Sequence, residues 1–358
     1  MNSDSIQPIG TGTTSPVLVV PYMWIGDFVR CHTVVRLLQE RWPERPVDLL
    51  TSRNNAPLLD YMPGVRKGIV CDLPRRKLPL SQYRDLARRL QSEGYGTALI
   101  MLRTWKAALA PFLAGIPERV GFFGEGRFFL LSDLRWGERR LPRMTDRCAA
   151  LALPKDAPLP AHWPVPKLVI PPTEVAAWKS SRGLTTDARP IVAVAPGAVG
   201  PGKRWPTSRF AELVRRLAGD RASVWVVGGP AEAPSAREIA AAGGPAVRDL
   251  TGTDLRDAII ALKGADVAVS NDSGLMHVAA ALATPTIALF GPTDPRICGP
   301  LNPLAATLEP STSKPCSRCG RSDCTDVLHR RVEDISLDRV IDALRMTLAG
   351  NLVHGSRI

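Results

Sequence analysis

The stretch from residue 265 to 295, ADVAVSNDSGLMHVAAALATPTIALFGPTDP, constrains the fold of this chain more than any other segment. It opens with an apolar run at 267–269 that is short enough to be a buried strand. A polar, glycine-bearing turn follows, and residues 275–282 have the apolar spacing of a helix. A second buried strand is expected at 286–290. The order of these segments predicts one βαβ unit of a parallel sheet.

The turn of this unit is suited to a phosphate group. Asp272 or Ser273 is placed to cap the predicted helix, and Gly274 lets a ligand approach the backbone closely. Free N–H groups and the positive dipole end at a helix N-terminus favour an anion. An ordinary capped helix in an α/β sheet has the same local sequence, so the phosphate hypothesis needs support from the rest of the chain.

Length and composition describe a globular protein with room for two cores. The chain has 358 residues, of which 45% are hydrophobic and 22% charged. No apolar run approaches the ~20 residues that span a bilayer, and the first 16 residues lack the basic and apolar regions of a signal peptide. The odd count of seven cysteines argues against the disulfide framework of a secreted protein. We therefore expect a cytoplasmic protein.

The charge is concentrated in the first half of the chain. Residues 1–170 hold 24 Lys and Arg against 15 Asp and Glu, whereas residues 171–358 hold 22 against 19. A basic half predicts an anionic partner: a phosphorylated substrate, a phospholipid surface or nucleic acid. The aromatic content of 6% and the lack of a zinc-finger or stacking pattern disfavour nucleic acid. Surface arginines without a partner are the alternative.

The first half begins like an open parallel α/β domain. A buried-strand run at 16–21 leads into a turn with Gly26 and then a helix from about residue 28 to 40. In such domains the ligands lie at the carboxyl ends of the strands. Asp27 is expected at that edge, where it either caps the helix or faces a ligand.

The second half restarts with a buried strand at 190–195. Residues 197–203 formally fit G-x-x-x-x-G-K, but Arg204 replaces the Ser or Thr that would bind magnesium, so we reject a P-loop. No G-x-G-x-x-G follows the first strand of either half, which disfavours a dehydrogenase. A further strand is predicted at 223–227, and Glu232 lies just past it, a position at which an acidic residue can hold ribose hydroxyls.

Three segments, in the correct order, resemble the ADP-heptose:lipopolysaccharide heptosyltransferases (glycosyltransferase family 9), closest to the heptosyltransferase II branch. The first is F-x-A-G-I-P-x-R-x-G at 112–121. The second is P-G-A-x-x-G-P-x-K-R-W-P, which residues 196–206 match with one residue fewer. The third is N-D-S-G-L-M-H-V-A-A-A-L at 271–282 with P-T-x-A-L-F-G-P-T behind it. The resemblance covers residues 16 to 348.

The resemblance implies an α/β fold of GT-B architecture, with two Rossmann-like domains whose parallel sheets face each other across a cleft. It further implies an inverting transfer of heptose from ADP-L-glycero-D-manno-heptose to the inner core of lipopolysaccharide. Two alternatives remain open. One is a related glycosyltransferase that uses another nucleotide sugar or glycan acceptor. The other is a nucleotide-binding α/β protein without transferase activity.

The resemblance also assigns roles to individual residues. Asp27 would be the general base, and Lys203 would stabilise the departing diphosphate. The donor-binding residues would be Gly197, Lys203, Glu232, Asp272, Ser273, Gly274, Leu275 and His277. Lys106 and Arg119 would contact the acceptor, although each has the alternative of being a solvated surface cation. No cofactor would be required beside the ADP-sugar donor.

The implied partners are the nucleotide sugar and an acidic inner-core acceptor that carries Kdo carboxylates and phosphates. Such an acceptor implies peripheral contact with the cytoplasmic face of the inner membrane, and no nucleic acid. The spacing of Cys316, Cys319, Cys324 and His329 can hold zinc, but the second tight cysteine pair of a zinc ribbon is lacking and none of the chemistry requires a metal.

The domain organisation follows from the elements and from a proline-rich segment. Residues 154–172 hold seven prolines and read as a stiff linker. We expect a disordered segment at 1–15, an acceptor-binding domain at 16–170, a hinge at 171–189, a nucleotide-sugar-binding domain at 190–335 and a closing helix and tail at 336–358.

Overall fold

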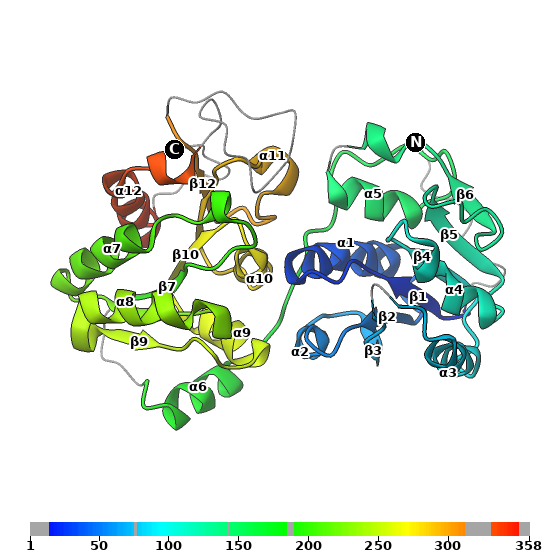
Figure 1. Ribbon diagram of the computed structural model, residues 1–358, viewed down its shortest axis with the longest axis horizontal. Coiled ribbons are helices and arrows are strands. Elements are labelled where there is room, and N and C mark those ends of the chain that lie inside the picture. The colour runs from blue at the N-terminus through cyan, green and yellow to red at the C-terminus, as the bar shows by residue number, and fades with distance from the viewer. Residues whose placement is uncertain (1–13, 75–76, 142, 185–189, 312–330, 351–358) are drawn as a thin grey trace. The chain divides into compact units, whose positions relative to one another are not determined.

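The computed structural model describes residues 14–74, 77–141, 143–184, 190–311 and 331–350. The chain divides into two compact units, Met1–Pro166 (unit 1) and Lys167–Ile358 (unit 2). Each unit is built on one six-stranded parallel sheet that is covered by helices (Figure 1). The predicted α/β class with parallel sheets is therefore confirmed.

Unit 1 has the strand order β3-β2-β1-β4-β5-β6, and every neighbouring pair is parallel. Its helix α1 packs beside α5, and α3 packs beside α4. The strands are β1 (Val17–Val20), β2 (Val47–Thr51), β3 (Val65–Val70), β4 (Thr97–Ile100), β5 (Glu118–Phe122) and β6 (Asp133–Arg135). The helices are α1 (Ile25–Arg41), α2 (Ala56–Leu59), α3 (Leu80–Gln91), α4 (Trp105–Leu113) and α5 (Met144–Leu151).

Unit 2 has the order β12-β11-β10-β7-β8-β9, again parallel throughout. The strands are β7 (Ile191–Ala195), β8 (Ser223–Val226), β9 (Val247–Asp249), β10 (Val267–Asn271), β11 (Thr286–Leu289) and β12 (Ala305–Leu308). The helices are α6 (Pro172–Ser181), α7 (Thr207–Gly219), α8 (Ala233–Gly243), α9 (Leu255–Gly264), α10 (Gly274–Ala281), α11 (Pro295–Cys298) and α12 (Leu337–Leu348). Counted within each unit, both sheets have the Rossmann order 3-2-1-4-5-6, a structural repeat that the sequence does not display.

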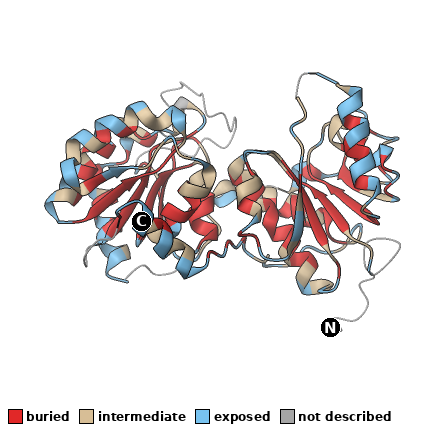
Figure 2. Ribbon diagram, turned by 90° about the horizontal axis from the view of Figure 1, so that it is seen from below, coloured by how far each residue is buried: buried red, intermediate tan, exposed pale blue. Residues whose placement is uncertain are grey.

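The central strands form because their side chains are apolar and often β-branched. Val17–Val20 and Ile191–Ala195 are buried along their whole length, as parallel strands covered on both faces must be. Figure 2 shows this pattern in both units: the strands are buried, while the helices expose their outer faces. The predicted βαβ stretch is confirmed as β10, α10 and β11, with β10 and β11 paired in parallel register.

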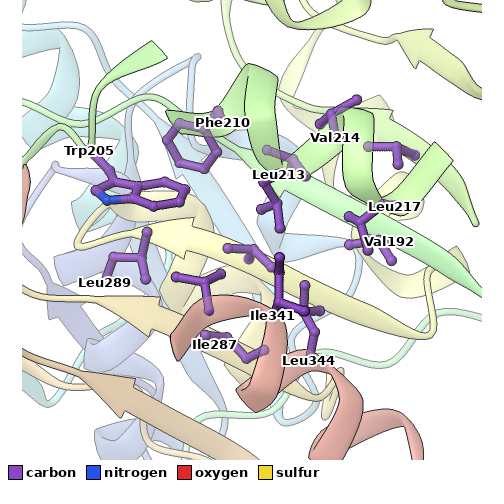
Figure 3. Close-up of a cluster of buried hydrophobic side chains, with 14 of the residues drawn as sticks. Val192, Trp205, Phe210, Leu213, Val214, Leu217, Ile287, Leu289, Ile341 and Leu344 are labelled. Carbon is purple, nitrogen blue, oxygen red and sulfur yellow. The ribbon is translucent and has the colours of Figure 1, made fainter. Parts of the chain in front are cut away.

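One core of unit 2 lies between its sheet and the helices α7 and α12 (Figure 3). Trp205, which is 2% exposed, belongs to this core and packs edge-on against Phe210 at 5.0 Å between ring centroids. Its indole N–H donates a 3.0 Å hydrogen bond to the carbonyl of Ile335. The chain immediately after Lys203 is therefore anchored in the core.

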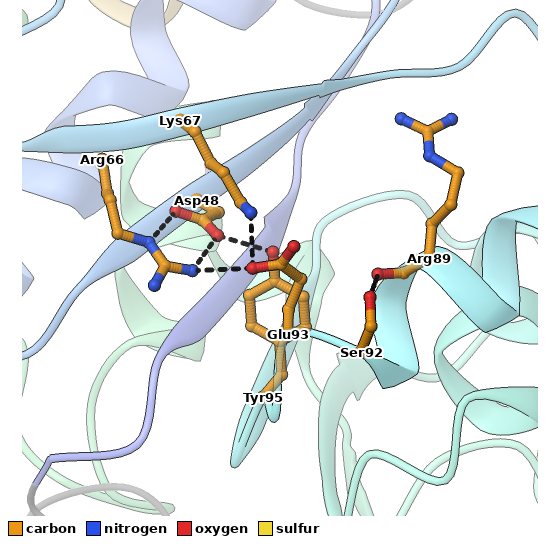
Figure 4. A network of polar contacts seen from close by, with 7 residues as sticks. All are labelled: Asp48, Arg66, Lys67, Arg89, Ser92, Glu93 and Tyr95. Atoms are coloured by element: carbon orange, nitrogen blue, oxygen red, sulfur yellow. Dashed lines mark hydrogen bonds and ion pairs between the residues drawn. The ribbon is translucent and has the colours of Figure 1, made fainter.

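In unit 1, a buried carboxylate lies near the amino end of the sheet, on β2. Asp48, with a fully buried side chain, accepts two hydrogen bonds from Arg66, at 2.9 and 2.5 Å, and one from the hydroxyl of Tyr95 at 2.6 Å (Figure 4). Glu93 joins the network through Arg66 and Lys67. Burying a charge is tolerated only when it is paired in this way, and the network ties β2, β3 and the start of β4 together.

The division between the units falls between Pro166 and Lys167, inside the proline-rich segment. The segment that we expected to be the hinge contains the helix α6, which belongs to unit 2. There Trp178 donates a 2.7 Å hydrogen bond to Asp257, and Lys179 donates one of 2.7 Å to the carbonyl of Gly264. The functional domain boundaries remain a prediction. Among the described helices, none is both long enough and apolar enough to cross a membrane.

Candidate active site

In a doubly wound sheet, the loops that leave the two central strands run in opposite directions, and ligands bind where they separate. In unit 1 this switch point lies at the carboxyl ends of β1 and β4, and in unit 2 at those of β7 and β10. The predicted residues Asp27 and Lys106 follow β1 and β4, and Lys203 and Asp272 follow β7 and β10. The residues predicted from the local sequence thus lie at the carboxyl edges of the two sheets, where the strand order also predicts ligand binding.

Lys203 and Asp272 form an ion pair at the edge of unit 2. The Lys203 ammonium lies 2.7 Å from Oδ2 of Asp272, and the two side chains are 20% and 6% exposed. The hydroxyl of Thr293 donates a 2.6 Å hydrogen bond to the same carboxylate oxygen. The carboxylate thus fixes the position of the cation. Because an ammonium has three donors, it can bind Asp272 and an anionic ligand at the same time.

Asn271, the last residue of β10, forms hydrogen bonds to both ends of the loop that carries Lys203. Its side-chain amide donates a 2.7 Å hydrogen bond to the carbonyl of Pro196 and accepts one of 3.1 Å from the backbone N–H of Trp205. Asn271 is fully buried, so both bonds are shielded from water. One side chain therefore joins the two ends of the loop and ties them to the strand that precedes Asp272.

Glu232 lies against Gly197. A Cβ atom on Gly197 would come within 2.7 Å of a Glu232 carboxylate oxygen, so the two loops approach closely only because residue 197 is glycine. The other carboxylate oxygen accepts a 2.9 Å hydrogen bond from the backbone N–H of Gly229. The acidic group is held between the loops after β7 and β8, where hydroxyl groups of a ribose can reach it.

The helix α10 begins at Gly274, with Ser273 at its N-cap. The Ser273 side chain makes no capping hydrogen bond; its hydroxyl lies 3.2 Å from that of Ser270. Ser273 thus occupies the predicted N-cap position but makes no side-chain capping bond, and the Asp272 carboxylate is engaged by Lys203 and Thr293 instead. The first backbone amides of α10, including that of Leu275, form the positive end of the helix dipole at this edge. His277 lies one turn further along the helix and is buried.

Gly291 brings the loop after β11 against the Lys203 loop. A Cβ on Gly291 would lie 3.0 Å from the carbonyl oxygen of Gly202 and 2.9 Å from the backbone nitrogen of Val332. The absence of a side chain thus allows the close approach that places Thr293 beside Asp272. The edge of unit 2 is built from three loops held in mutual contact.

In unit 1, Asp27 lies inside α1 rather than ahead of it. The helix begins at Ile25, three residues earlier than expected, so Asp27 is in the first turn and the N-cap is Trp24. Its carboxylate, 26% exposed, pairs with Arg30 one turn along the helix at 2.5 Å. The capping alternative is therefore excluded. The carboxylate is partly accessible and close to the positive end of the helix dipole.

Two cations lie at the same edge after β4. Lys106, the second residue of α4, donates a 3.2 Å hydrogen bond to the carbonyl of Lys77, and its ammonium lies 6.0 Å from the ring centroid of Trp105. Arg103, which is 51% exposed, pairs with Glu138 at 3.0 Å. Both are in position to contact an anionic ligand that reaches the β1–β4 switch point.

The structure does not bring Arg119 to this edge. Arg119 is the second residue of β5, at the amino end of the sheet, and its guanidinium donates hydrogen bonds to the backbone carbonyls of Leu130, Ile116 and Pro117. Burial lowers the pKa of this guanidinium. Its observed contacts stabilise the turn before β5, and we leave it out of the acceptor site.

Residues 83–326 match the model of a family described as glycosyltransferase family 9 (heptosyltransferase). Lipopolysaccharide heptosyltransferase 2 of Escherichia coli (strain K12) is 34% identical over 346 residues, which cover 93% of this chain and 98% of that protein. Lipooligosaccharide heptosyltransferase 2 of Haemophilus influenzae is 33% identical over 346 residues, covering 93% and 99%. The chain belongs to glycosyltransferase family 9.

Solved structures agree with this assignment. The structure of E. coli ADP-heptose lps heptosyltransferase II has a TM-score of 0.82 and 32% identity over 94% of this chain and 99% of that one. A glycosyltransferase family 9 protein from Veillonella parvula, with 19% identity and a TM-score of 0.82, supports the fold alone. The predicted resemblance and the GT-B fold class are confirmed.

Within this family 9 chain, sequence reasoning missed three residues at the two edges: Asn271, Thr293 and Arg103. Each had a local signal, because Asn271 directly precedes Asp272, Thr293 lies in the quoted G-P-T segment, and Arg103 directly follows an apolar run at 98–102. The cysteine and histidine cluster at 316, 319, 324 and 329 lies outside the described residues. Among the cysteines that the structure describes, Cys31, Cys71 and Cys148 are free thiols, and the Cys298 thiol donates a 3.2 Å hydrogen bond to the carbonyl of Asp294.

Proposed function

We propose that this chain is an inverting glycosyltransferase of the heptosyltransferase II type. It transfers heptose from ADP-L-glycero-D-manno-heptose to the inner core of lipopolysaccharide. The observation that carries the proposal is the 34% identity to lipopolysaccharide heptosyltransferase 2 over 93% of the chain. The pairing of Lys203 with Asp272 beside the N-terminus of α10 gives that similarity a chemical basis.

Unit 2 binds the ADP-sugar in this proposal. The diphosphate accepts hydrogen bonds from the first amides of α10 and from the Lys203 ammonium, whose position Asp272 fixes. Glu232 accepts hydrogen bonds from ribose hydroxyls, and Asp272 has lone pairs left for the sugar. These groups stabilise the negative charge that develops on the departing ADP, so the reaction requires no cofactor.

Unit 1 supplies the base. Asp27 removes the proton of the acceptor hydroxyl, and the resulting oxygen attacks the anomeric carbon from the face opposite the leaving group. The bond from the anomeric carbon to the diphosphate oxygen breaks, ADP leaves with the bonding electron pair, and the configuration inverts. Arg30 holds the carboxylate in place, and Lys106 with Arg103 attracts the carboxylates and phosphates of the acceptor.

The test is release of ADP by the purified protein, given ADP-heptose and a deacylated Kdo–lipid A core acceptor that already bears one heptose. Wild type and Asp27→Asn are compared, and we expect kcat to fall about 10²–10⁴-fold in the variant with ADP affinity retained. Asp85→Asn is a matched control. Asp85 also pairs with an arginine three residues on, Arg88 at 2.7 Å, but on the exposed face of α3.

Acceptor-dependent ADP release by wild type and by Asp85→Asn, but not by Asp27→Asn, supports the reaction and the base. Full activity in Asp27→Asn refutes Asp27 as the base. No turnover by wild type, together with tight ADP binding, refutes this donor and acceptor pair and favours another sugar or glycan.

A further inference from the structure

Unit 1 exposes aromatic side chains at one end of the edge that carries Asp27. The exposed aromatic residues in the described part of the chain are Trp24, Phe112, Phe128, Phe129 and Trp136, and three of these five lie between residues 128 and 136. Phe129 is 88% exposed, Trp136 64% and Phe128 50%. Large apolar side chains gathered on a surface in this way mark an interaction site.

Phe123, Phe128, Phe129 and Trp136 form what we call the aromatic cluster. The strands β5 and β6 end side by side, where the backbone N–H of Phe123 donates a 2.8 Å hydrogen bond to the carbonyl of Arg135. The ring of Phe123 stacks on Trp136 at 4.4 Å between centroids and lies 5.1 Å from Phe128. These contacts hold the rings of Phe123, Phe128 and Trp136 in place, and Phe129 follows Phe128 in the chain with its side chain in water.

Cations border the aromatic cluster. Arg139 and Arg140 are exposed on the turn that follows Trp136, and Arg103 is exposed at the end of β4. Aromatic rings beside arginines match an anionic lipid surface, because the rings enter the interface while the guanidinium groups bind the head groups.

The position of the aromatic cluster fits an acceptor that is linked to a lipid. Asp27 follows β1, Lys106 follows β4, and the cluster follows β5 and β6, all at the carboxyl edge of one sheet. From β1 to β6 there are three strand spacings, or about 15 Å. A glycan of a few sugars can span that distance, with its reactive hydroxyl at Asp27 and its lipid anchor at the cluster.

We propose that the aromatic cluster, with Arg139 and Arg140, docks unit 1 onto a membrane surface that contains anionic phospholipid. The inference rests on the proposed function, which supplies a lipid-linked acceptor. A second copy of the chain is a less suitable occupant. The edge strand β6 has only three residues, and Asp133 and Arg135 on it pair with each other at 2.7 Å, features that resist strand-to-strand association.

The experiment is co-sedimentation of the full-length chain with vesicles of phosphatidylglycerol and phosphatidylethanolamine, and with vesicles of phosphatidylcholine alone. Wild type should bind the anionic vesicles preferentially. Phe129→Ser should weaken that binding at least about tenfold, since it removes a large apolar group from the interface. Arg139→Gln with Arg140→Gln should remove most of the salt-dependent part of the binding. Met346→Ser, an exposed apolar residue (41%) on α12 of unit 2, is the control and should bind like wild type.

Turnover separates this inference from the proposed function. Phe129→Ser should use the deacylated acceptor at the wild-type rate, yet lose at least about tenfold in rate with the same acceptor lipid-linked in vesicles. Wild-type turnover of the deacylated acceptor together with undiminished vesicle binding by Phe129→Ser would overturn the docking surface alone. Failure of wild type on the deacylated acceptor would overturn the proposed function instead. A wild-type dimer in solution that Phe129→Ser dissociates would show that the surface joins two copies, and would also overturn the inference.

Discussion

The carboxyl edges of the two sheets share one topology but are built differently. In unit 2, Asn271 joins Pro196 to Trp205, and Asp272 holds Lys203 and Thr293, so the polar groups bind one another across loops. In unit 1, each charged group has a separate partner: Asp27 has Arg30, Arg103 has Glu138, and Lys106 has a backbone carbonyl. An interlinked edge suits one compact nucleotide, whereas separate cations and exposed rings suit an extended anionic acceptor. The same fold therefore supports a preorganised site and an adaptable surface.

Apart from loss of the base Asp27, the largest expected effect comes from breaking the ion pair of unit 2. Lys203→Met should lower kcat about 10²–10³-fold, because the charge on the leaving diphosphate loses its point of stabilisation. ADP release under saturating acceptor measures the effect. Lys263→Met is the control, since that ammonium bonds only to the carbonyl of Leu282 among the contacts described. A loss confined to KM would contradict a role for Lys203 in leaving-group departure.

Acid should weaken unit 1 through the helix that carries Asp27. Burial lowers the pKa of His32 in α1 to about 4, and Nε2 of this residue lies 2.8 Å from the carbonyl of Pro63. Because the pKa is near 6.5 in the unfolded chain, the unfolded state binds the proton more tightly. The free energy of unfolding should therefore fall as the pH drops from 6.5 toward 4, by about 3 kcal/mol at pH 4.

Hydrogen exchange of the α1 amides between pH 7 and pH 4 checks this prediction. His32→Gln keeps a donor for the Pro63 carbonyl and removes the titrating group, so its stability should depend less on pH than that of wild type. Equal pH dependence in both proteins would exclude His32 as the cause.

A smaller loss of stability should follow from removing the hydrogen bonds that Asn271 makes to the loop that carries Lys203. Asn271→Ala leaves the carbonyl of Pro196 and the N–H of Trp205 without their side-chain partner, which should lower the free energy of unfolding by about 2–3 kcal/mol. ADP affinity should fall as well, since the loop positions Lys203. Urea unfolding and ADP titration measure the two effects. Thr251→Ala removes a hydrogen bond to Asp249 that is exposed to water, and it should change neither quantity appreciably.

The smallest effect is expected at the acceptor edge. Lys106→Met should raise KM for the acceptor up to about tenfold with kcat unchanged, because one of several cations is lost from a surface that water screens. Steady-state kinetics at low and high salt test this. Wild type should show the greater salt dependence, and an unchanged KM at low salt would remove Lys106 from the acceptor site. Lys77→Met is a suitable comparison, since it keeps the backbone carbonyl that Lys106 contacts.

The sequence by itself predicted the two parallel α/β halves, the strand ends that carry Asp27, Lys203 and Asp272, and the family. These features are local: runs of buried residues predict strands, and the turn that follows a strand in a parallel sheet must lie at its carboxyl edge. The beginning of α1 was predicted three residues late, since Ile25 and Gly26 give no clear signal of a helix start.

Only the tertiary structure decided which of these residues meet. Asn271 and Pro196 are 75 residues apart and come together because β10 lies beside β7, an order that local patterns do not encode. Arg119 is the second residue of β5 and so lies at the amino end of the sheet, although its motif had suggested an acceptor contact. The exposure of Phe129 could not be predicted from the sequence either, because an aromatic residue in a loop is buried or exposed according to what the rest of the chain packs against it.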